Sequence, residues 1–201
     1  MFSIKSNRTK TYWSLQAKGY GDVHERGIRA YLRKKEFTAN LSLLSLKPGE
    51  TVLDAGCGSG ITTKPLAGEG RKVIAADFSE EMVKEARRAG FNAIVEDIST
   101  MSISERFDKI LSAGVFEYLE NPEQALLNLK RHLKSEGILV ISAPRLSIAG
   151  ILYMLMHFVK GICVKLYSER YFLILFKKNG LRVQGVKKTP LSLHIAGMSL
   201  S

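Results

Sequence analysis

Short apolar stretches alternate along the middle of the chain with longer segments whose apolar residues recur at helical spacing. The apolar stretches are rich in Val, Ile and Leu, which is typical of strands buried on both faces. They lie at residues 51–53, 72–76, 92–95, 107–112 and 137–142. The segments that begin at Ser79 and Pro122 predict helices. This alternation predicts an α/β fold with a doubly wound, mostly parallel sheet.

The two flanks predict further elements. A helical pattern from about residue 23 to 44 precedes the first strand, and Ser168 opens a helix that ends near Asn179-Gly180. Residues 181–186 and 191–196 then predict a closing antiparallel hairpin. We expect one domain over residues 1–201. Its parts are an N-terminal helical lid (1–47), a ligand-binding core (48–146), an apolar insert with a helix (147–180) and the hairpin (181–201).

The loop after the first strand carries Gly56, Gly58 and Gly60 at alternate positions. Glycine lets the backbone turn sharply and approach a ligand closely. We expect residues 61–64 to open a helix, whose free N–H groups favour an anionic group. A dinucleotide fingerprint needs its third glycine three positions after the second, and Ile61 and Thr63 occupy those positions. The spacing therefore argues against a nicotinamide or flavin site.

With Asp54 at the end of the strand, the loop resembles motif I of the class I S-adenosylmethionine (SAM)-dependent methyltransferases. Asp77 ends the second strand about twenty positions later, where a carboxylate can accept hydrogen bonds from ribose hydroxyls. Four motifs match in order over about residues 50–145. The resemblance implies a Rossmann-like class I methyltransferase fold of seven strands, with SAM as cofactor. The cofactor-binding residues that it implies are Asp54, Gly56, Cys57, Gly58, Gly60, Asp77, Phe78, Met82, Asp97, Ile98, Ala113, Gly114 and Tyr20, with Tyr12 as the alternative to Tyr20.

Residues 115–122 resemble the small-molecule methyltransferases related to quinone biosynthesis enzymes. Tyr118 stands where many of those relatives carry histidine, which excludes a histidine base at this position. Glu117 and Tyr118 are the nearest ionisable groups to the expected methyl position and are our catalytic candidates. For Glu117, orienting or deprotonating the acceptor competes with a helix-capping or solvated role. His157 and His194 are further candidate bases, whereas His132 is expected on a solvated helix face.

The formal net charge of +11 belongs to the flanks. Residues 1–36 carry a net +6, residues 37–147 a net −2 and residues 148–201 a net +7. We expect methyl transfer to oxygen or carbon of a small apolar or anionic acceptor. Two alternatives stay open: an RNA-directed methyltransferase that uses the basic flanks, and a SAM-binding protein without turnover. Residues 112–115 lack the Asn/Asp-Pro-Pro-aromatic motif of enzymes that methylate exocyclic amino groups, so nucleic acid is the less favoured partner.

Residues 147–167 form a mostly apolar run with Lys160 and Lys165, too short to cross a bilayer. Such a segment can rest on an anionic membrane surface or enclose a lipid-like acceptor. The competing interpretation is a helix that covers the edge of the sheet. No apolar signal segment follows Met1, so we expect a cytoplasmic protein with this peripheral contact as an added hypothesis. Cys57 and Cys163 have no metal-ligand spacing, and we expect no metal site.

Overall fold

The computed structural model describes residues 4–17 and 27–200. The α-helices are α1 (Ile4–Gln16), α2 (Gly27–Leu44), α3 (Glu80–Arg88), α4 (Pro122–Arg131), α5 (Ile148–Phe158) and α6 (Glu169–Lys178). The strands are β1 (Thr51–Ala55), β2 (Lys72–Asp77), β3 (Ala93–Val95), β4 (Phe107–Ala113), β5 (Leu133–Pro144), β6 (Leu181–Lys188) and β7 (Ser192–Ser199). Two short 3₁₀ helices are η2 (Lys64–Leu66) and η3 (Phe116–Tyr118).

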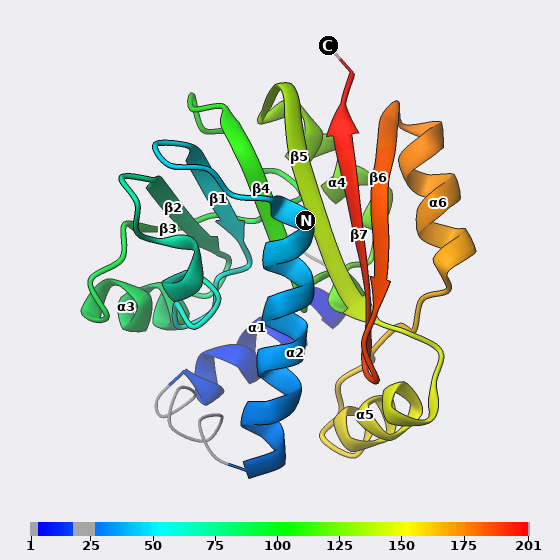
Figure 1. The fold of residues 1–201 in the computed structure, drawn as a ribbon. Helices are drawn as coiled ribbons and strands as arrows, with labels where there is room; N and C mark the ends of the chain where they lie inside the picture. The colour runs from blue at the N-terminus through cyan, green and yellow to red at the C-terminus, as the bar shows by residue number, and fades with distance from the viewer. Residues whose placement is uncertain (1–3, 18–26, 201) are drawn as a thin grey trace.

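The strands form one seven-stranded sheet in the order β3-β2-β1-β4-β5-β7-β6. Neighbouring strands among β1 to β5 pair in parallel, whereas β7 runs antiparallel to both β5 and β6. Figure 1 shows α2 across one face of the sheet and α4 behind the other. The expected fold class, with its mostly parallel sheet and closing hairpin, is confirmed.

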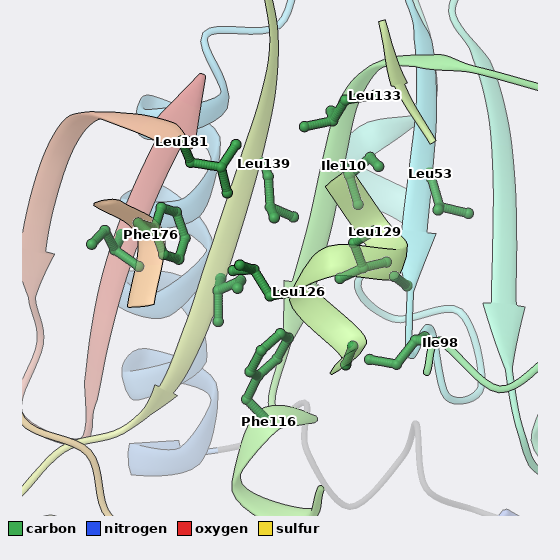
Figure 2. Close-up of a cluster of buried hydrophobic side chains, with 14 of the residues drawn as sticks. Leu53, Ile98, Ile110, Phe116, Leu126, Leu129, Leu133, Leu139, Phe176 and Leu181 are labelled. Carbon is green, nitrogen blue, oxygen red and sulfur yellow. The ribbon is translucent and has the colours of Figure 1, made fainter. Parts of the chain in front are cut away.

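The main core lies between the sheet and the helices α4 and α6. Leu53, Ile110 and Leu139 project from three strands toward Leu129 of α4, and Phe176 of α6 extends the same cluster (Figure 2). All five side chains are fully buried. Burying one such side chain contributes roughly 1.5–3 kcal/mol to the free energy of folding. This layer therefore holds the strands in place, and the loops of the functional site follow the ends of these strands.

Three details differ from the expected elements. Residues 61–63 form turns and are followed only by η2, because the hydroxyls of Thr62 and Thr63 bond inward to Asp54 and Pro65 lacks a backbone donor. Strand β5 begins at Leu133 rather than at residue 137, and it pairs with β4 from that point. His132 is buried instead of solvated, and its Nδ1 lies 2.8 Å from the carbonyl oxygen of Asn128.

Candidate functional site

A cavity of about 930 Å³ opens at the carboxyl ends of β1, β2, β4 and β5, toward the bottom of Figure 1. Helices α1, α2 and α5 complete its walls. Cavities of this size are typical of sites for small molecules and cofactors. The carboxyl edge of a parallel sheet is also where open α/β folds bind their ligands. The cavity is therefore the candidate functional site.

The glycine loop forms one wall of the cavity and is tied to the end of β2. Gly56 has φ +90°, and a Cβ there would lie 2.1 Å from Cγ2 of Val115, so only glycine fits. The backbone N–H of Gly58 donates to Asp77 Oδ2 at 2.9 Å. Gly60 does not line the cavity. The space that a Cβ of Gly60 would occupy is filled by the ring of Phe91.

Asp54 lies behind the cavity wall rather than in it. The side chain is fully buried, and its Oδ2 accepts hydrogen bonds from the hydroxyls of Thr62 and Thr63, both at 2.7 Å. Burial raises the pKa of Asp54 to about 6, while the two hydroxyl donors act in the opposite direction. The resemblance placed Asp54 at the cofactor. The geometry makes it the group that folds the loop residues 59–63 back onto β1.

Asp77 does face the cavity, at the end of β2. Its Oδ1 accepts from the backbone N–H of Ser79 at 2.9 Å, and burial raises the pKa of the carboxyl. Each carboxylate oxygen has two lone pairs, so both oxygens retain capacity for a ligand's hydroxyl groups. Phe78 and Met82 line the same part of the cavity beside it.

The remaining predicted cofactor residues converge here from the next loops. Those that line the cavity are Cys57, Asp97, Ile98, Ala113 and Gly114. Asp97 Oδ1 accepts from the N–H of Ser99 at 2.8 Å, which fixes the turn after β3. Burial raises the pKa of the Cys57 thiol, so this cysteine is a small apolar wall residue. Tyr20 falls outside the described residues, whereas Tyr12 lines the cavity.

Aromatic side chains form a further wall of the cavity, the aromatic wall, made of Trp13, Tyr118, Tyr153 and His157. Trp13 meets Tyr118 at a ring-centroid distance of 5.5 Å, and Tyr153 lies 4.2 Å from His157. The hydroxyls of Tyr118 and Tyr153 are 2.6 Å apart, and this contact joins η3 to α5. Sequence reasoning did not identify Trp13 or Tyr153 as site residues. Trp13 is the chain's single tryptophan, which is the one signal that could have marked it.

Four glutamates line the cavity beyond the predicted cofactor residues: Glu36, Glu96, Glu117 and Glu120. Glu117 is 2% exposed, and its Oε2 has no hydrogen-bond partner among the described residues. Burial raises the pKa of Glu117 to about 8. The solvated role is therefore wrong for this side chain. Glu36 of α2 also lines the cavity, and nothing in the sequence pattern marked it.

The two candidate histidines differ in their access to the cavity. His157 lines it, and burial lowers the pKa of its imidazole. His194 is fully buried and does not line the cavity. Its Nδ1 lies 2.7 Å from Asn40 Oδ1 and its Nε2 lies 3.2 Å from Glu36 Oε2. His194 is therefore linked to the cavity through Glu36 and Asn40, which both line it.

The described residues contain no group of three or more His, Cys, Asp or Glu side chains placed to hold a metal ion. Among the helices with described coordinates, none combines the length and the apolar character needed to cross a membrane.

The comparisons with known proteins agree with the resemblance found in the sequence. Residues 53–141 match the model of a methyltransferase domain. A malonyl-[acyl-carrier protein] O-methyltransferase of Bacillus cereus is 35% identical over 123 residues, 56% of this chain and 46% of that protein. A ubiquinone biosynthesis O-methyltransferase of Rickettsia canadensis is 32% identical over 97 residues, 45% of this chain and 41% of that protein. The matched region thus spans less than half the length of these curated relatives.

Among solved structures, the magnesium protoporphyrin IX methyltransferase of Synechocystis PCC 6803 with bound S-adenosylhomocysteine superposes with a TM-score of 0.75. The superposition covers 95% of this chain and 98% of that one at 19% identity, so it establishes the fold. The resemblance predicted from the glycine loop is confirmed: residues 53–141 match a methyltransferase domain, and the chain has the fold of solved SAM-dependent methyltransferases.

Proposed function

We propose that this chain is a methyltransferase that binds SAM and transfers its methyl group to a small acceptor. The observation that carries the proposal is the cavity, which gathers the glycine loop, Asp77 and the loop after β4 at one end. A second region of the cavity, lined by the aromatic wall and by Glu36 and Glu117, remains free for an acceptor. One cavity thus offers space for two reactants side by side.

The residues present fit the cofactor. Gly58 has φ +54°, and the nearest atom to a Cβ built there is Met82 Sδ at 3.9 Å, so its face of the loop is open. We assign the ribose to Asp77, the adenine to Asp97 and Ile98, and the methionine end to Gly56, Gly114 and α1. When bound, SAM supplies a methyl group on a positively charged sulfur.

The chain's own contribution is to position the two reactants and to exclude water. Trp13 and Tyr118 cover the cavity from two different elements, and the bond between Tyr118 and Tyr153 holds α5 against them. We propose oxygen as the accepting atom, in keeping with the two relatives named as O-methyltransferases. The aromatic wall favours an acceptor with an apolar body.

We also propose that α5 rests on an anionic membrane surface. Ile148, Leu152 and Leu155 follow one another at helical spacing and are 81%, 57% and 50% exposed. Tyr153 and His157 point from the other side of the same helix into the cavity. Lys160 and Lys165 follow the helix and supply charge opposite to that of anionic headgroups. A lipid-like acceptor would then enter beside the surface that holds it.

Incubation of the protein with methyl-labelled SAM and separate metabolite, lipid and RNA extracts tests this function. We expect label in a small molecule of the metabolite or lipid extract. Label in RNA would contradict the proposed acceptor class and support the alternative that uses the basic flanks. SAM binding without label in any fraction would leave a SAM-binding protein without turnover and overturn the enzymatic proposal.

A further inference from the structure

Glu36 and Glu117 reach the same cavity from opposite parts of the chain. Glu36 belongs to α2, which lies across one face of the sheet, and Glu117 belongs to η3 after β4. The carboxyl of Glu117 lies beside Gly114, since a Cβ at Gly114 would be 3.8 Å from Glu117 Oε1. Glu117 therefore stands where the proposed cofactor region meets the rest of the cavity.

The two carboxyl groups have different surroundings. Glu36 Oε1 accepts a hydrogen bond from the Thr189 hydroxyl, and Glu36 Oε2 faces His194 Nε2 at 3.2 Å. Glu117 Oε2 has no partner among the described residues, although it is buried. One carboxyl is held by donors from the β6–β7 hairpin, and the other lines the cavity with one buried oxygen that has no partner among the described residues.

Because of these surroundings, the carboxyl groups of Glu36 and Glu117 have different pKa values. Burial by itself would raise the pKa of Glu36, but hydrogen bonds from His194, Ser192 and Thr189 bring it below its ordinary value. Burial, together with a smaller effect of the negative charge of Glu36, raises the pKa of Glu117 to about 8. At pH 7 Glu36 is therefore an ionised acceptor and Glu117 a neutral donor. Carboxyl pairs separated in this way commonly divide the roles of base and acid.

We propose that Glu36 and Glu117 bind the acceptor together and that the acceptor is a neutral, ring-bearing hydroxyl compound. Its O–H donates to Glu36, and its oxygen accepts from Glu117. As the new O–CH₃ bond forms, the hydroxyl proton passes to Glu36. When bound, SAM would supply the methyl group, and the electron pair of the broken C–S bond would remain on its sulfur. The inference rests on the proposed methyltransferase function and names the acceptor class for that cavity.

Other charge classes fit the pair less well. A hydroxyl both donates and accepts, as one ionised and one protonated carboxyl require, whereas an ammonium group only donates. A carboxylate acceptor would bring a second negative charge beside Glu36. The rings of Trp13 and Tyr118 provide the flat apolar surface that an aromatic acceptor needs. The sequence left an apolar or an anionic acceptor open. The two carboxyl groups and the aromatic rings together favour a neutral acceptor.

Three probes that share one ring test the inference: 4-methylphenol, 4-methylbenzoate and 4-methylbenzylamine. Their binding is measured by calorimetry at pH 7 in the presence of S-adenosylhomocysteine. We expect 4-methylphenol to bind at least ~10-fold more tightly than either charged probe, the size of one lost hydrogen bond to a charged group. Glu36→Gln should weaken 4-methylphenol by at least ~10-fold. Glu169→Gln, which removes a carboxyl paired with Lys188 outside the cavity, is the matched control.

Glu117→Gln separates a donor role from a merely structural one. An amide still donates, so the variant should bind 4-methylphenol at pH 7 about as well as the wild type. In the wild type the affinity should fall as the pH rises from 7 to 9 and Glu117 ionises, and in the variant it should not. The groups that act on Glu117 are Glu36 from α2 and Tyr167, whose hydroxyl donates to the carbonyl of Phe116 at 2.8 Å. Neither titrates in this range, because the pKa of Glu36 is lowered and that of Tyr167 is raised.

The outcomes separate the two proposals. If S-adenosylhomocysteine does not bind in a first titration, the methyltransferase function itself fails. If it binds, but either charged probe matches 4-methylphenol, or no phenol binding is detected, the assignment of the pair is overturned. The same holds if Glu36→Gln leaves phenol binding unchanged while thermal unfolding shows that the variant is folded.

Discussion

At the scale of single residues, two aspartates at neighbouring strand ends have different roles. Asp77 faces the cavity, and Asp54 faces two threonine hydroxyls behind the loop. Both follow buried apolar strands, and the sequence alone offers no means of separating them. The difference arises because Thr62 and Thr63 turn inward and satisfy one oxygen of Asp54.

The buried Asp54 predicts a pH dependence of stability. Its pKa of about 6 lies above the ordinary 3.8, so the folded protein holds this proton more tightly than the unfolded chain does. This contribution is fully present below about pH 4 and is lost as the pH rises to about 6. It amounts to about 3 kcal/mol. Asp54→Asn should remove that part of the pH profile.

Chemical denaturation of the wild type and Asp54→Asn at several pH values between 4 and 7 measures the difference. The wild type should lose unfolding free energy relative to the variant as the pH rises. If the two curves of unfolding free energy against pH run parallel, the pKa of Asp54 is not raised in the folded protein. The placement of Asp54 as a buried group behind the loop would then be wrong.

The glycines show a similar limit of sequence reasoning. Gly56, Gly58 and Gly60 were all expected beside the ligand, and Gly56 and Gly58 line the cavity. Gly60 instead makes room for Phe91, a residue thirty-one positions later that only the folded chain brings near. A glycine pattern predicts close approach but does not identify what approaches.

At the scale of elements, the strand and helix pattern predicted the strands of the mostly parallel sheet and its closing hairpin well. Apolar strands and capped helices are local features, and Ser79 and Ser168 accept the expected backbone hydrogen bonds at their helix starts. The contact of Glu36 with His194 was not predictable in the same way. It joins α2 to β7 across most of the chain, and no local spacing marks such a pair.

Helix α5 is the element with the clearest separate test. Of its residues only Gly150 and His157 are buried, whereas Ile162, Val164 and Tyr167 in the rest of the apolar segment are buried. We expect the protein to co-sediment with anionic liposomes more than with neutral ones, and less as salt is raised, because attraction contributes about 1 kcal/mol per basic residue near the surface. Replacing Ile148, Leu152 and Leu155 by serine should abolish this binding.

The matched control for the liposome test is Leu127→Ser, which removes an exposed leucine from α4. It should leave co-sedimentation unchanged, and all variants should bind SAM with wild-type affinity. If the wild-type protein ignores anionic liposomes at low salt, α5 only walls the cavity and the membrane proposal is wrong.

At the scale of the whole molecule, the cavity depends on segments that lie far apart in the sequence. The loops after β1, β2 and β4 supply the side where we place the cofactor, and these loops are where the sequence was most informative. Helices α1, α2 and α5 supply the acceptor side from the basic flanks. Those flanks carry no recognisable motif, so their aromatic and carboxyl groups became apparent only in the folded chain.

The central claim is that this cavity binds SAM, and calorimetric titration of the wild type and Asp77→Asn with SAM tests it most directly. We predict binding by the wild type and a loss of about 1.5–3 kcal/mol in the variant, or roughly 10- to 150-fold, because a charged acceptor for the ribose is removed. NADH should neither bind nor compete, since the loop lacks the dinucleotide spacing. No SAM binding by the wild type, or equal affinity in a folded Asp77→Asn variant, would contradict the account.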